Sequence, residues 1–291
     1  TLTSGLLSGE IDGVYGAPAT SYSELETASD GKLYFGKSLI ITELAPTSNT
    51  GPIGNVKVRQ ALSLALDRTA IAKVIYGGAA VPNEALTPPT AWTGAPSVYA
   101  AAYAKLPSAK VDLSEAKKLV SSVPDHAKPI VLAILAGDQT QLELGTAVQQ
   151  AGKEIGLNIK LDEMQSLDFD GAFFTAGYRK GINMIVDNGY LDVPTPLDYL
   201  GLWFPKGAIF DYTTYTNATV NIDLKRAIEN YTDKARAGLI TSAQALYMKD
   251  FIVIPVVNPD QGLFLNDSIT GAPASFAYIY EPCFAKLGAT K

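Results

Sequence analysis

The segment from residue 129 to residue 161 constrains the fold more strongly than any other part of the chain. Residues 129–136 form a continuous apolar run, which is typical of a strand that is buried on both faces. Asp138, with Gln141 three residues later, has a helix-capping pattern, and an apolar stripe then continues at helical spacing to Gly156. Apolar and polar residues alternate over 157–162, which predicts a second strand. Strand, capped helix and strand in succession predict a βαβ unit, and therefore an α/β fold with a mixed, partly parallel sheet flanked by helices.

Other helices are indicated by caps and by apolar spacing. Residues 56–76 predict two abutting helices, the second capped by Asp67 and ended by Gly77 and Gly78. Asp112 begins a capping box, so a short helix is expected to follow it through Ser122. Three more helices are expected at residues 194–203, 222–236 and 242–249.

Two further strands and one long loop complete the expected elements. Strands are predicted at 182–186 and 251–257, and Pro255 in the latter favours an edge strand or a strand end because proline lacks the N–H that a ladder needs. Residues 81–107, rich in Pro, Ala and Thr, read as a loop too long for an ordinary connection, which suggests a functional role.

Composition excludes several classes of function. The 291 residues are 47% hydrophobic, which is enough for a sizeable core, and no apolar run approaches the roughly 18 residues of a membrane-spanning helix. The net charge of −6, without a Lys/Arg cluster, argues against nucleic acid as a partner. His126 and Cys283 are the only residues of their kinds, so we expect neither a disulfide framework nor a bound metal, and no cofactor.

Four segments, in order along the chain, resemble the family 5 extracellular solute-binding proteins, which are receptors for oligopeptides, dipeptides and nickel chelates. The most specific is NVKVRQALSLALDR at residues 55–68, which is similar to the helix pair of that family. The others are LSGEID at 7–12, VDLSEAKKL at 111–119 and GYLDVPTP at 189–196. The chain departs from the pattern at Asn55 and Thr195, where an Asp is usual.

This resemblance implies a lobe of the type II periplasmic-binding-protein fold and a receptor that acts outside the cytoplasm. Members of the family are longer, so the chain is expected to be a carboxy-terminal fragment, with the export signal outside it. Residues 1–45 would be the remnant of the amino-terminal lobe with the hinge strands, 46–258 the carboxy-terminal α/β lobe, and 259–291 a return segment. The resemblance further implies a monomer without enzymatic activity that binds a short peptide or peptide-like solute and delivers it to an ABC permease.

Asp192 is the leading candidate for ligand contact. The resemblance implies that the matching Asp accepts the ammonium group of a bound peptide, and its place just past a predicted strand suits a ligand at the carboxyl ends of strands. The alternative is that Asp192 caps the helix that follows.

Four other residues are weaker candidates for the ligand site. Tyr190 and Trp92 would supply apolar contact with the ligand, or would simply pack in the core. Glu43 lies near the supposed crossing strand and could equally be a solvated surface charge. Asp187 could face the cleft or end the strand at 182–186.

Two other functional classes compete with delivery to a transporter. A sensor or regulatory module could use the same cleft to report a ligand. A hydrolase could use Asp187 and Asp192 as paired carboxylates, but the chain has no nucleophile motif, Cys/His pair, phosphate loop or metal set to support the reaction.

Overall fold

The computed structural model describes residues 2–272 and 282–290, which fold around one mixed sheet. Its strand order is β1-β8-β3-β7-β5-β6, and β2 and β4 also pair with β8. β5 is parallel to β6 and β7, whereas β3 is antiparallel to β7 and β8. The strands are β1 Gly13–Tyr15, β2 Gly31–Lys37, β3 Ile40–Pro46, β4 Ala80–Pro82, β5 Pro129–Leu135, β6 Asn158–Met164, β7 Met184–Tyr190 and β8 Ile254–Asn266.

The predicted βαβ unit is confirmed. It consists of β5, α8 (Gln139–Glu154) and β6, with the two strands in parallel register along their whole length. A carboxylate oxygen of Asp138 accepts the N–H of Gln141 at 3.0 Å, and the Gln141 side chain accepts the N–H of Leu135 at 2.9 Å. Ile130, at 0% exposure, illustrates the burial that the apolar run of β5 predicted.

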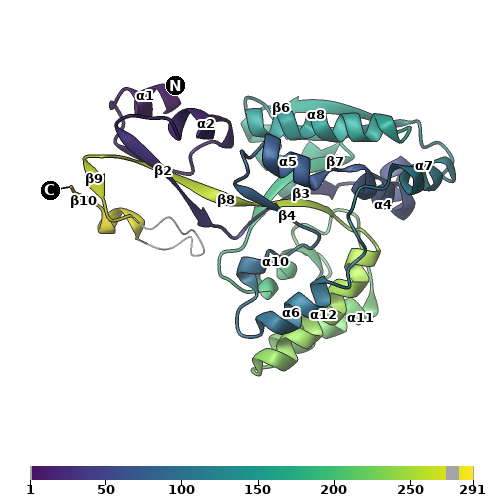
Figure 1. Cartoon of the computed structure of the whole chain (residues 1–291). Helices are drawn as coiled ribbons and strands as arrows, with labels where there is room; N and C mark the ends of the chain where they lie inside the picture. Colours follow the sequence, from purple (N-terminus) through teal and green to yellow (C-terminus); the bar gives the residue numbers. More distant parts are fainter. Residues whose placement is uncertain (1, 273–281, 291) are drawn as a thin grey trace.

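One face of the sheet is covered by α4, α5, α7 and α8 (Figure 1). The helix pair appears where it was expected, as α4 (Val56–Ala65) and α5 (Arg68–Val74). Asp67 caps α5 by accepting the N–H of Ala70, and Gly77 and Gly78 follow with φ of 59° and 86°, which glycine adopts without strain. Asp112 caps α7 (Leu113–Ser121).

The opposite face carries α6 (Pro96–Tyr103), α9 (Ser166–Phe174), α10 (Pro196–Trp203), α11 (Ala218–Ile228) and α12 (Asp233–Lys249). The predicted division at 222–236 and 242–249 is wrong, because α11 ends earlier and α12 runs unbroken to Lys249. Asn230 stabilises a turn between the two helices. Its side chain accepts a hydrogen bond from the N–H of Thr232, and its carbonyl accepts one from Nε of Arg236. The expected long loop also contains α6, which packs on α12.

Residues at the amino terminus form a separate unit beside this body (Figure 1). This N-terminal unit contains α1 (Leu2–Leu7), α2 (Tyr22–Leu25), β1 and β2, and it shares the second half of β8. The small sheet of β9 (Ile269–Thr270) and β10 (Gly288–Ala289) adjoins it. Short elements elsewhere are α3 (Gly51–Gly54), η1 (Ala19–Ser21), η2 (Pro89–Ala91), η3 (Ala176–Arg179) and η4 (Cys283–Lys286).

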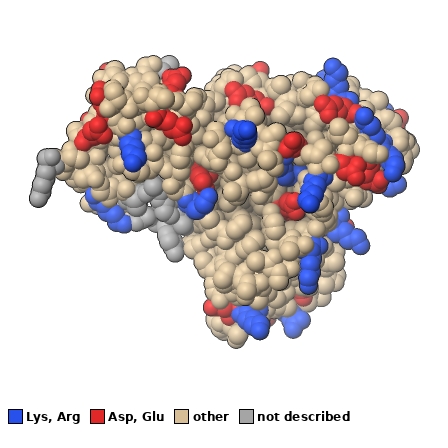
Figure 2. Space-filling view, viewed as in Figure 1, with Lys and Arg blue, Asp and Glu red and all other residues tan. Residues whose placement is uncertain are grey.

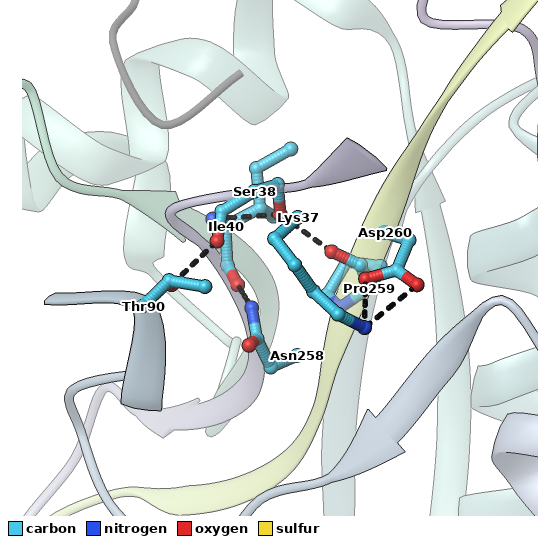
Figure 3. A network of polar contacts seen from close by, with 7 residues as sticks. All are labelled: Lys37, Ser38, Ile40, Thr90, Asn258, Pro259 and Asp260. Carbon is cyan, nitrogen blue, oxygen red and sulfur yellow. Dashed lines mark hydrogen bonds and ion pairs between the residues drawn. The ribbon is translucent and has the colours of Figure 1, made fainter. Parts of the chain in front are cut away.

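Polar contacts fix the point where the chain crosses between the two parts (Figure 3). The hydroxyl of Ser38 donates to the carbonyl of Pro259, and Lys37 forms an ion pair with Asp260 at 2.8 Å. Asn258 donates to the carbonyl of Ile40. Thus β8 is one strand of 13 residues that belongs to both parts, and Pro255 is its second residue, in the interior of the sheet at a strand end.

On the face shown in Figure 2, Lys and Arg side chains alternate with Asp and Glu across the upper part of the molecule, and the centre of the lower part is largely uncharged. Within residues 2–272 and 282–290, no helix combines the length and apolar character needed to cross a membrane.

Candidate functional site

Two cavities meet at the carboxyl end of β7. Cavity A, of about 580 Å³, lies between the N-terminal unit and the sheet, and its walls include Tyr15, Tyr22, Thr42, Asn188 and Asp260. Cavity B, of about 470 Å³, lies beside α9 and α10 and includes Phe169, Phe173, Asp187, Asp192, Tyr199 and Phe210. Both lie at the strand ends where ligands gather in α/β folds, and both volumes suit small-molecule sites.

Tyr190 joins the two cavities. It is the last residue of β7, it is 54% exposed, and it contributes to the walls of both cavities. A half-exposed aromatic ring at this position can cover an apolar part of a ligand that extends from one cavity into the other.

Asp192 lies two residues past β7 and lines cavity B. The capping alternative is not observed, because α10 begins after Thr195 without a side-chain cap, and Asp198 instead accepts the backbone N–H of Asp192 at 2.7 Å. Among the described residues, nothing bonds to the Asp192 carboxylate, which is therefore free to accept hydrogen bonds from a ligand in cavity B.

Glu43 and Asp187 lie opposite each other on β3 and β7, and both are buried, with 0% and 6% exposure. The hydroxyl of Tyr199, from α10, lies 2.9 Å from Oε1 of Glu43 and 3.3 Å from Oδ2 of Asp187. Glu43 is therefore not the solvated surface charge that was the alternative, and Asp187 lies inside a strand that continues to Tyr190. Gly189 makes room for the cluster, because a Cβ there would collide with the Tyr199 hydroxyl.

Burial dominates the titration of these carboxyl groups. It raises the pKa of Asp187 to about 7, although the hydrogen bond from Tyr199 acts in the opposite direction. Burial also raises the pKa of Glu43 well above its usual value, and the nearby Asp187 carboxylate raises it further. Two buried carboxyl groups that share one hydroxyl cannot both be ionised cheaply, so the pair retains a proton near neutral pH.

Trp92 lines neither cavity. Its ring stacks on Tyr99 with centroids 6.1 Å apart and contacts Tyr103 at 5.3 Å, in the core beneath α6. The alternative that Trp92 simply packs is thus the arrangement observed, because α6 occupies the segment that was expected to be an open loop.

Two side chains with withdrawn polar groups, Tyr199 (buried) and Arg59 (partly buried), were not anticipated from the sequence. Tyr199 was not singled out, although acidic residues within the apolar runs around Glu43 and Asp187 signal a need for buried partners. The other is Arg59, whose guanidinium donates to the carbonyls of Ile53, Gly54, Asp250 and Phe251. Residues 2–272 and 282–290 contain no cluster of His, Cys, Asp and Glu that could hold a metal ion.

Comparison with known proteins identifies the family that shares this architecture. The family model "Bacterial extracellular solute-binding proteins, family 5 Middle" matches residues 1–211. The chain belongs to family 5 of the bacterial extracellular solute-binding proteins. Its fold is the type II periplasmic-binding-protein fold, as predicted.

Among sequence relatives of this family 5 chain, the periplasmic oligopeptide-binding protein OppA of Haemophilus influenzae is 22% identical over 84% of the chain and 45% of its own length. The substrate-binding protein CtaP of Listeria monocytogenes has a TM-score of 0.83 at 21% identity, over 100% of this chain and 58% of that one. The oligopeptide-binding protein AppA of Bacillus subtilis, solved with a nonapeptide, has a TM-score of 0.82 at 18% identity, with the same coverage. The chain thus spans about half the length of these relatives.

Proposed function

We propose that the protein is the solute-binding component of an ABC importer, acts outside the cytoplasm as a monomer, and hands a short peptide or peptide-like solute to a membrane permease. It has no catalytic role in this proposal. The residues numbered 1–45 and 259–291 would belong with an amino-terminal lobe, and 46–258 would form the opposing lobe.

This proposal rests on cavities A and B, which meet at Tyr190. Asp192 lies in the wall of cavity B. A partly buried carboxylate that has no partner within residues 2–272 and 282–290 gains most from a cationic group, and the amino terminus of a peptide supplies one. The relatives support the same ligand class, since OppA is named for oligopeptides and AppA was solved with a nonapeptide.

The strands that connect the two parts support a receptor that closes on its ligand. β8 runs through both parts, and the contacts of Ser38 and Asn258 hold the crossing in register (Figure 3). Cavity A is bounded by residues from both parts, so a relative movement of the parts would change its width and exclude water from a bound solute.

The test is isothermal titration of the full-length protein with alanine tripeptides whose amino terminus is either free or acetylated. We expect the free tripeptide to bind more tightly, and Asp192→Asn to weaken its binding by about 1.5–3 kcal/mol, or roughly 10- to 150-fold, the worth of a charge-assisted hydrogen bond. Asp162→Asn, on the exposed side of β6, is the matched control. Equal affinity of wild type and Asp192→Asn would exclude the assigned role.

A further inference from the structure

The cluster of Glu43, Asp187 and Tyr199 has no task in the function proposed above, yet it lies against cavity B. Asp187 and Tyr199 contribute directly to the cavity wall, and Glu43 lies one hydrogen bond behind them. Their strands and helix come from distant parts of the chain, so the arrangement exists only in the folded protein.

The cluster leaves carboxylate oxygens without donors. The single hydroxyl proton of Tyr199 is shared between Glu43 and Asp187, and Oε2 of Glu43 is buried without a partner in the described part of the chain. Asp187 is only 6% exposed. Its Oδ2 accepts from Tyr199, and no residue within 2–272 and 282–290 donates a hydrogen bond to its Oδ1. A buried acceptor without a donor is costly, and a donor entering cavity B can reach Asp187, which lines the cavity.

The surroundings of the cluster favour a cation. Cavity B also contains the carboxylates of Asp170, Asp192 and Asp198, and none of the described residues that line it is basic. Its other walls are aromatic: the ring of Phe173 contacts those of Phe169 at 5.3 Å and Phe210 at 6.4 Å. A cavity lined by both carboxylates and aromatic rings suits an aliphatic chain that ends in a positive charge.

The charged and titratable groups of the neighbouring elements do not supply this cation to Glu43 and Asp187. From the neighbouring elements these groups are Tyr199, Tyr212, Tyr247 and Arg179. Arg179 is the one cation among these four, and its guanidinium lies 4.5 Å above the ring of Tyr212 and donates to the carbonyl of Ala172.

We propose that cavity B is the subsite for a basic side chain of the bound solute, whose guanidinium or ammonium group contacts Asp187 and is held by the second carboxyl charge of Glu43. A guanidinium fits best, because its planar fork presents several donors to neighbouring carboxylate oxygens. This inference rests on the proposed function and specifies its ligand class as peptides that contain arginine or lysine.

Binding at this subsite is coupled to a proton. Burial raises the pKa of both carboxyl groups, so the empty pair holds a proton near neutral pH. An entering cation favours the ionised form, and the proton leaves to solvent as the ion pair forms. Affinity for a basic side chain therefore rises with pH through about 7, whereas affinity for a neutral side chain does not.

The experiment uses the full-length protein and tripeptides of alanine that carry one arginine, or one citrulline, at each of the three positions. Citrulline has nearly the shape of arginine but no charge. We expect at least one arginine tripeptide to bind tenfold or more tightly than its citrulline counterpart, and to release up to one proton at pH 6.5 when titrated in buffers of different ionisation enthalpy. Asp187→Asn should remove most of this preference, and Asp162→Asn should preserve it.

Two outcomes separate this inference from the function on which it rests. If the tripeptides bind but arginine and citrulline are equivalent at every position in the wild-type protein, the subsite is refuted and peptide binding stands. If no tripeptide binds, both are overturned. The comparison within the wild-type protein does not depend on the folding of Asp187→Asn.

Discussion

Replacing Asp187 by Asn should change how the stability of the protein depends on pH. In the wild type, burial raises the pKa of Asp187 from 3.8 to about 7. A carboxyl group whose pKa is higher in the folded than in the unfolded state stabilises the fold while both states are protonated, at low pH. That contribution is lost as pH rises from about 4 to about 7, because the unfolded chain ionises freely and the folded protein cannot.

The size of the effect follows from the same values. A pKa about 3 above the ordinary value corresponds to about 4 kcal/mol, at 1.36 kcal/mol for each tenfold change in the proton equilibrium. Asn has the same shape and no charge to bury. Between pH 4 and pH 8, the free energy of unfolding of Asp187→Asn should therefore increase by up to about 4 kcal/mol relative to that of the wild type, so the variant becomes the relatively more stable protein at high pH.

Urea unfolding at constant ionic strength, at several pH values between 4 and 8, measures this difference. Tryptophan fluorescence is a suitable signal because Trp203 lies in the same core as Tyr199, with ring centroids 6.1 Å apart. Asp162→Asn, on the exposed side of β6, should follow the wild-type curve. If the curves for wild type and Asp187→Asn run parallel over the whole range, the carboxyl pair does not hold a proton and the reasoning is refuted.

Two other substitutions test the packing around the site. Gly189→Ala should destabilise the fold by about 1–3 kcal/mol, because its Cβ would collide with the hydroxyl of Tyr199, and Tyr199→Phe should relieve part of that loss. Gly201 lies in α10, and a Cβ there would meet nothing within 4 Å, so Gly201→Ala should leave stability unchanged or raise it by up to about 1 kcal/mol. Equal changes in melting temperature for Gly189→Ala and Gly201→Ala would contradict the steric argument. Arg59→Met should cost about 3 kcal/mol in urea unfolding, since four carbonyls lose their donor, and the exposed Arg226→Met should cost almost nothing; similar losses in both would show that the carbonyl contacts contribute little.

The sequence alone determined several helix starts, the βαβ unit and the class of fold. Asp67, Asp112 and Asp138 mark helix starts because a capping side chain bonds to an N–H only two or three residues away, a relation that needs no tertiary contact. The apolar run of β5 likewise showed a strand covered on both faces. The Asp192 position was also visible in the sequence, because a strand end is a local feature.

Tertiary structure alone decided which side chains meet at cavity B. Glu43 and Tyr199 are 156 positions apart, and their hydrogen bond exists because β3 pairs with β7 while α10 folds back over both strands. The packing of the partly buried Trp92 was decided in the same way, by α6, whose Tyr99 stacks on it. Local spacing encodes contacts between neighbours along the chain, whereas the burial and pKa of a carboxyl group depend on every element that closes over it, and those elements meet only after folding.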